Sequence, residues 1–137
     1  MEPGPQQWYR FYRDTTQTTY RRTKDKRTKL RLAREATAMF WASAFEPVWT
    51  FRNAASSDAE LSLAWAEHER RRYADAVVMI ESFEHLFREG MTTQVATDVY
   101  WAIASVETVH NLISRGWSMQ QFAEWLTDSM DRLLLVR

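Results

Sequence analysis

The residues best suited to acid–base or metal chemistry in this sequence are its three histidines, at positions 68, 85 and 110. No two of them have the i, i+3 or i, i+4 offset that places two metal ligands on one face of a helix. Glu81 and His85 have that offset, but no third ligand accompanies them. The sequence contains no Cys, which excludes disulfides, thiolate zinc sites and Cys nucleophiles. We therefore expect no metal site, no cofactor and no catalytic set, in a protein that is not an enzyme.

Glycine and carboxylate patterns support the same expectation. A phosphate-binding loop needs clustered glycines, whereas Gly4, Gly90 and Gly116 stand far apart. Acidic pairs such as Glu67 and Glu69 lie among charged neighbours, so we expect them to face solvent. General acid–base catalysis needs a shielded site that shifts a carboxyl pKa, and the sequence indicates none.

Aromatic and Met side chains at helical spacing form the more informative set. Most aromatic residues with this spacing pack in a core. A ligand site is also mainly apolar with a few polar anchors, so several of these residues are candidates for lining a cavity that binds an apolar or aromatic small molecule. The predicted ligand-binding residues are Phe40, Trp41, Phe45, Trp49, Trp65, Tyr73, Phe83 and Trp101.

The elements that must position these residues are predicted to be helices. Hydrophobic residues make up 45% of the 137, against three Gly and three Pro, which favours one all-α domain with a sizeable core. The apolar spacing predicts helices over residues 28–53, 58–88, 92–113 and 119–135. Pro47 is expected to bend or break the first helix after Phe45, and Gly90 to stop the second.

Membrane and targeting signals are absent from the sequence. No window offers about 18 consecutive apolar residues, and the N-terminus lacks the apolar core of a secretory signal. We expect a cytoplasmic protein with no membrane partner.

Charge is distributed unevenly along the chain. Residues 1–35 hold ten Lys and Arg against four acids, whereas residues 36–137 hold eight against fourteen. This split predicts a basic, aromatic-containing and partly disordered N-terminal arm over 1–35, and a helical domain over 36–137. The arm could bind nucleic acid by combining cations with stacking rings. The alternative is a solvated tail, which is favoured because runs of charged residues usually stay in contact with water.

The predicted helix 92–113 is apolar around most of its circumference. Its apolar residues are Val95, Ala96, Val99, Tyr100, Ala102, Ile103, Val106, Val109, Leu112 and Ile113. Such a helix must be covered on more than one side. One chain of this length can cover one side with its own core, so the surplus predicts a partner subunit.

The same region resembles a known family. The residues from Thr97 to Glu107, followed by Gly116-Trp117-Ser118, Phe122 and Trp125-Leu126, look like the last two helices of the C-terminal domain of TetR-type (tetracycline-repressor-type) transcriptional regulators. A weaker likeness extends upstream through 54–66, so the resemblance covers roughly residues 36–135. It implies a helical bundle that holds an inducer inside, with its last two helices pairing with those of a second subunit as a four-helix dimer interface.

This resemblance gives a set of expected homodimer contacts. The predicted interface residues are Val99, Val106, His110, Ile113, Phe122, Leu126 and Met130. His110 lies in an apolar stretch, where a hydrogen-bonded core or interface histidine is the expected role.

The sequence departs from the family at its N-terminus. TetR-type repressors begin with a helix-turn-helix whose recognition helix enters the major groove of DNA. Residues 1–35 have no apolar spacing of that kind and no Gly after position 4. We therefore expect an effector-binding and dimerisation domain that binds DNA only if a longer chain or a partner supplies the helix-turn-helix domain, the DNA-reading head. The alternative is a small helical protein that binds nucleic acid through the basic arm.

Overall fold

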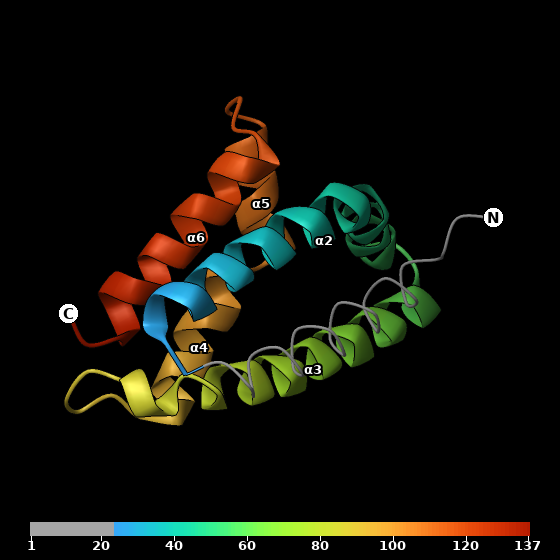
Figure 1. Ribbon diagram of the computed structural model, residues 1–137. Helices are drawn as coiled ribbons and strands as arrows, with labels where there is room; N and C mark the ends of the chain where they lie inside the picture. The colour runs from blue at the N-terminus through green and yellow to red at the C-terminus, as the bar shows by residue number, and fades with distance from the viewer. Residues whose placement is uncertain (1–23) are drawn as a thin grey trace.

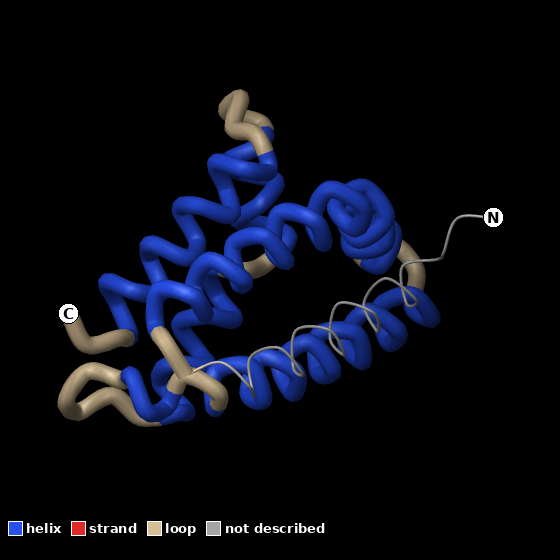
Figure 2. The backbone as a smooth tube through the Cα atoms, in the orientation of Figure 1, coloured by secondary structure: helices blue, strands red, loops and turns tan. Residues whose placement is uncertain are grey.

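The computed structural model describes residues 24–137, and within that range the protein is all-helical, as predicted. Figure 2 shows the described chain as helices joined by loops. The elements are α2 (Lys26–Ala55), α3 (Ala59–Glu81), the 3-10 turn η1 (Glu84–Leu86), α4 (Thr93–Ile103), α5 (Val106–Ile113) and α6 (Met119–Leu134). No helix within 24–137 is long and apolar enough to cross a membrane.

α2 begins at Asp25, whose carboxylate accepts hydrogen bonds from the backbone N–H (2.9 Å) and the hydroxyl (2.7 Å) of Thr28. This is the usual chemistry of an acidic N-cap. Pro47 lies inside the helix, which nevertheless continues to Ala55. A proline without an N–H bends a helix that tertiary contacts hold together, and the axis of α2 turns in its second half (Figure 1). Of the two effects expected of Pro47, the helix bends and does not break.

α3 is shorter than predicted, because the helix ends at Glu81 instead of continuing to about Arg88. Phe83 is only 1% exposed, and the chain leaves the helix there to bury it. The chain then forms the turn η1 and passes beside the C-terminal residues. Phe87 forms a β-bridge with Leu135, and the backbone N–H of Arg88 donates to the carbonyl of Leu134 at 2.9 Å. Long-range packing has ended this helix before its local stop signal at Gly90.

The predicted helix 92–113 is two helices, with a break at Ala104 and Ser105. Thr92 caps α4, since its hydroxyl accepts from the N–H of Val95 at 3.2 Å. Ser105 caps α5 by accepting from the N–H of Thr108 at 3.2 Å. The apolar residues on either side of the break consequently face different neighbours.

α6 is amphipathic, as its sequence pattern predicts. Ser118 and Gln121 form a capping box at its start, each side chain bonded to the other's backbone N–H. Gly116, at φ +96°, provides the left-handed turn that leads into it. The buried face carries Phe122, Ala123, Leu126, Thr127, Met130 and Leu134. The opposite face carries Gln121, Glu124 and Asp128, which are exposed.

Two groups of buried side chains hold the helices together. The first core cluster lies where the start of α2 meets the end of α3, the start of α4 and the end of α6; its buried members are Ala33, Met79, Ile80, Phe83, Ala96, Met130, Leu134 and Leu135. The second core cluster joins the second half of α2 to α5 and the start of α6; its buried members are Trp41, Ala44, Phe45, Val48, Ala104, Val106, Val109, Phe122 and Leu126. α2 crosses the molecule between α6 and α3 and contributes to both clusters (Figure 1).

Residues of the predicted basic arm enter this fold. The boundary predicted at residue 35 falls inside α2, and residues 1–23 lie outside the described residues. Lys29 is fully buried, with its ammonium 4.6 Å from the centre of the Phe83 ring. Lys26 forms an ion pair with Asp131 at 3.0 Å, and Arg31 pairs with Glu35 at 3.2 Å. Three cations of the predicted arm are thus engaged by the fold itself.

Candidate ligand-binding site

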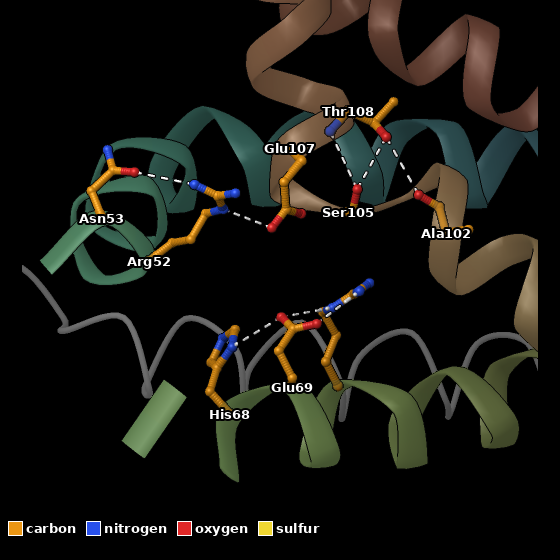
Figure 3. A network of polar contacts seen from close by, with 9 residues as sticks. Arg52, Asn53, His68, Glu69, Ala102, Ser105, Glu107 and Thr108 are labelled. Carbon is orange, nitrogen blue, oxygen red and sulfur yellow. Dashed lines mark hydrogen bonds and ion pairs between the residues drawn. The ribbon is translucent and has the colours of Figure 1, made fainter. Parts of the chain in front are cut away.

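Charged side chains from three helices face one another where α3 passes the second half of α2 and the start of α5. Glu107 of α5 points toward α3, and Arg52 of α2 extends toward Glu107 (Figure 3). His68 and Glu69 of α3 point toward this pair. Arg52 and Glu107 form an ion pair at 2.7 Å, yet their side chains are 38% and 43% exposed. This ion pair is therefore in contact with water.

Arg52 is held in position by its neighbours. Its Nε donates to Glu107, its Nη1 donates to the Asn53 side-chain oxygen at 3.3 Å, and its guanidinium lies 5.0 Å from the centre of the Trp49 ring. A cation over an indole face is attracted to the ring. The three contacts orient the guanidinium across the end of α2.

The break between α4 and α5 positions Glu107. The hydroxyls of Ser105 and Thr108 lie 3.0 Å apart, and the Thr108 hydroxyl donates to the carbonyl of Ala102 at 3.4 Å (Figure 3). Glu107 lies in the first turn of α5, where the helix dipole favours an acid. An unbroken helix would have no N-terminus at this point.

On α3, Glu69 and Arg72 form an ion pair on the side of the site opposite Arg52 and Glu107. Arg72 donates from Nε and Nη2 to the two oxygens of Glu69 at 3.3 and 3.1 Å, and from Nη1 to the carbonyl of Trp101 at 3.1 Å. Its guanidinium also lies 4.6 Å from the centre of the Trp101 ring. His68 Nδ1 is 3.6 Å from Glu69, longer than a hydrogen bond. Arg72 thereby joins α3 to α4 in addition to pairing with Glu69.

Electrostatics keep Glu69 ionised. Burial raises the pKa of its carboxyl group, but His68 and Arg72 lower that pKa by more, so the net shift is downward. The carboxylate therefore stays charged and continues to accept from Arg72 at neutral pH.

Aromatic rings surround these charges, and histidines stack on two of them. His110 is parallel to Trp49 with ring centres 3.9 Å apart, and His68 is stacked on Trp65 at 4.9 Å. Phe51 meets Trp65 edge-on at 5.2 Å. His110 is half-buried, and its ring contacts with Trp49 replace the hydrogen bond that its sequence position led us to expect.

The predicted ligand-binding residues separate into three groups. Trp49, Trp65 and Trp101 lie beside the charged side chains just described, and Tyr73 meets the Trp101 ring edge-on while donating to Asp98 at 2.8 Å. Phe40, Trp41 and Phe45 belong to the second core cluster, where Trp41 and Phe45 are buried and Phe40 packs against them. Phe83 is buried in the first core cluster, apart from the other seven.

The sequence did not reveal the polar members of this site. Arg52, His68, Glu69, Arg72 and Glu107 are brought together from three helices, and few of their contacts are local in sequence. Glu69 and Arg72 have the i, i+3 spacing of a helical ion pair, and Arg52 follows Trp49 at the same spacing. Those spacings could have indicated each local pair, but not that the pairs from different helices lie close together.

Four of the seven predicted dimer contacts are buried within the single chain. These core residues are Val106, Phe122, Leu126 and Met130. Of the apolar residues in 92–113 that predicted a second subunit, Ala96, Val106 and Val109 are buried within the single chain. Val99, His110 and Ile113 keep partial exposure.

The site holds no group of metal ligands. Within residues 24–137, no three His, Asp or Glu side chains gather closely enough to hold a metal ion. Glu81 and His85 do not share a helical face, because α3 ends at Glu81, and His85 Nε2 lies 2.9 Å from the carbonyl of Lys24. The arrangement offers paired charges and ring faces, which suit binding.

Comparison with models of protein families, with curated proteins and with solved structures finds no match for this chain.

Proposed function

We propose that this protein is a small-molecule-sensing helical domain of the kind found in TetR-type regulators, and that it binds an apolar or aromatic effector where α3 meets α2 and α5. The observation that carries the proposal is the inward-facing but water-accessible pair Arg52–Glu107 beside Trp49. Binding sites combine ring and aliphatic surface with a few polar anchors, and this place has both.

The mechanism of sensing follows from which helices the effector would touch. α3 contributes His68, Glu69 and Trp65, whereas α2 and α5 contribute Arg52, Trp49 and Glu107. An effector bound between them favours arrangements in which α3 lies close to α2 and α5, and so shifts the population toward those arrangements. With a DNA-reading head supplied by a longer chain or a partner, that shift would change the spacing of two heads.

Homodimer formation belongs to the same proposal. Val99 and Ile113 are the apolar members of the predicted interface that keep partial exposure, so Ile113→Glu is the variant that weakens the dimer without opening the core. Sedimentation velocity is expected to give a dimer for the wild type and a monomer for Ile113→Glu. A monomeric wild type at about 100 µM, well above a micromolar Kd, would remove dimerisation from the proposal.

Effector binding is tested by thermal denaturation with a panel of naphthalene and indole compounds. A ligand that binds only the folded protein stabilises it by about 2.7 kcal/mol at 100 times its Kd. Trp65→Phe should reduce this stabilisation because it shrinks a ring of the site. Trp117→Phe is the matched control, since Trp117 packs against Trp125 of α6. The proposal fails if no compound raises the Tm, or if both variants lose the effect equally.

A further inference from the structure

α3 is long for the support that the described residues give it. Of its 23 residues, those buried within the described part of the chain are Ala76, Met79 and Ile80, near its C-terminal end. Residues 59–75, roughly four to five turns of helix, contain no buried side chain. A helix in water is held mainly by packing one of its faces against other elements. The first two thirds of α3 therefore call for a further element to pack against.

One flank of α3 is apolar and stays in contact with water. Leu61, Ala64 and Val78 share this side of the helix, because they are three and then fourteen residues apart, which is close to one turn and four turns. Leu61 is 38% exposed, Ala64 is exposed and Val78 is half-buried. The neighbouring side of the helix meets α2 through Trp65 and α4 through Arg72. The flank is thus a docking face next to the side that the described helices cover.

The N-terminal segment, residues 1–23, joins the described chain at one end of this flank. The carbonyl of Lys24 lies 2.9 Å from Nε2 of His85, just beyond the end of α3 at Glu81. The start of α2 lies beside that end of α3 in Figure 1. At a rise of 1.5 Å per residue α3 is about 34 Å long, and 23 residues span about 34 Å as a helix or about 76 Å when extended. The N-terminal segment is therefore long enough to cover the whole of α3.

The composition of the N-terminal segment suits an apolar face. Four aromatic residues stand within five positions, at Trp8, Tyr9, Phe11 and Tyr12. Trp8, Phe11 and Tyr12 have the i, i+3 and i+4 spacing that places three rings on one side of a helical turn. A buried aromatic side chain contributes about 150–250 Å² of contact surface. Small side chains such as Ala64 leave room for rings of that size.

We propose that the N-terminal segment packs along the flank of α3 formed by Leu61, Ala64 and Val78, with the rings of residues 8–12 as its buried contacts. This inference goes beyond the proposed function and does not depend on it. Rings held against α3 are not free to stack on bases, so the proposal also counts against the alternative in which the basic arm binds nucleic acid.

Paramagnetic relaxation enhancement in the full chain tests the contact. The sequence contains no Cys, so one introduced cysteine carries the only spin label. Leu63→Cys places the label on α3, at a side chain that is 75% exposed. Ser114→Cys is the matched control, because Ser114 is also exposed and lies in the turn after α5, away from α3 (Figure 1). The label on α3 should cause loss of the amide signals of residues 8–12, and the label at the control position should leave them unchanged.

Hydrogen exchange identifies the side chains that make the contact. Phe11→Ser should raise the exchange rates of the amides of residues 61–72 about tenfold, which corresponds to about 1.4 kcal/mol of local stability. Gln6→Ser is the control within the same segment and should leave these rates unchanged. The amides of α6 should exchange at wild-type rates in both variants, which shows that the rest of the fold is intact.

Three outcomes would overturn the proposal. If the signals of residues 8–12 keep their intensity with the label on α3, or lose it equally with either label, the N-terminal segment does not lie on α3. If the loss arises only in a mixture of labelled chain and unlabelled isotope-enriched chain, the flank is occupied by a second copy. If Phe11→Ser and Gln6→Ser change exchange in α3 to the same extent, the rings are not the buried contacts.

Discussion

Arg72 connects two helices of the site, α3 and α4. It binds Glu69 within α3, and it reaches α4 through the carbonyl and the ring of Trp101. Its side chain is 14% exposed, so these contacts are only partly screened by water. A partly buried, fully bonded guanidinium of this kind is costly to remove because its carboxylate partner stays behind.

We expect Arg72→Met to lower the free energy of unfolding by about 1–2 kcal/mol. Arg70→Met is the matched control, because Arg70 is on the same helix, also pairs with a glutamate, and is largely exposed; it should cost less than about 0.5 kcal/mol. Urea denaturation followed by circular dichroism measures both. Equal effects would show that Arg72 stabilises nothing beyond a surface ion pair.

Lys29 makes the free energy of unfolding depend on pH in the alkaline range. Burial, reinforced by the charge of Lys24, lowers the pKa of its ammonium group from 10.5 to about 8. Between those values the unfolded chain holds a proton that the folded chain has released, so the free energy of unfolding rises with pH. The rise from this residue is at most about 1.4 kcal/mol per pH unit.

The measurement is urea denaturation at pH 7.5, 8.5 and 9.5 for the wild type and Lys29→Met. The wild type should gain stability relative to the variant across that series. A difference that stays constant with pH would mean that Lys29 keeps its ordinary pKa in the fold.

At the scale of the elements, the break between α4 and α5 decides where Glu107 lies. Ser105 gives α5 its own N-terminus, and the first turn of α5 then places the acid opposite Arg52. The contact between α2 and α5 at the site therefore depends on a cap in the middle of an apolar stretch.

Ser105→Ala should cost about 1 kcal/mol of stability, because the N–H of Thr108 loses its acceptor. Ser105→Gly should cost only a few tenths, since glycine is tolerated at an N-cap. Thermal denaturation of both variants checks the pair. If the alanine variant is no less stable than the glycine variant, the cap does not stabilise the break.

At the scale of the whole molecule, burial determines which apolar residues are core and which are surface. Leu126 is 1% exposed in the second core cluster, whereas Leu133 on the same helix is 46% exposed. These two leucines distinguish a residue that holds the chain together from one available to a partner.

Leu126→Glu is expected to unfold the chain, because an unpaired carboxylate in the core costs more than about 4 kcal/mol. Leu133→Glu should keep the wild-type helical content by circular dichroism. A folded but monomeric Leu126→Glu, beside a dimeric wild type, would instead restore Leu126 to the dimer interface.

Local chemistry in the sequence predicted a substantial part of the fold. Sparse breakers indicated an all-α chain, and the polar and apolar faces of α6 follow from its residue spacing. These features depend on residues within a turn or two of one another, which is why they can be inferred without a structure. Within the site, the same local reasoning identified Trp49, Trp65 and Trp101 as aromatic side chains of interest.

Tertiary structure alone decided where α3 ends, where the 92–113 segment breaks, and what covers its apolar faces. α3 stops at Glu81 so that Phe83 can be buried and the following chain can pair with Leu135. Val106 and Leu126 are covered by their own chain. The meeting of Arg52 with Glu107 joins residues far apart in the sequence. Each of these outcomes depends on which distant surfaces fit together, and the free energy of that packing has no counterpart in local residue spacing.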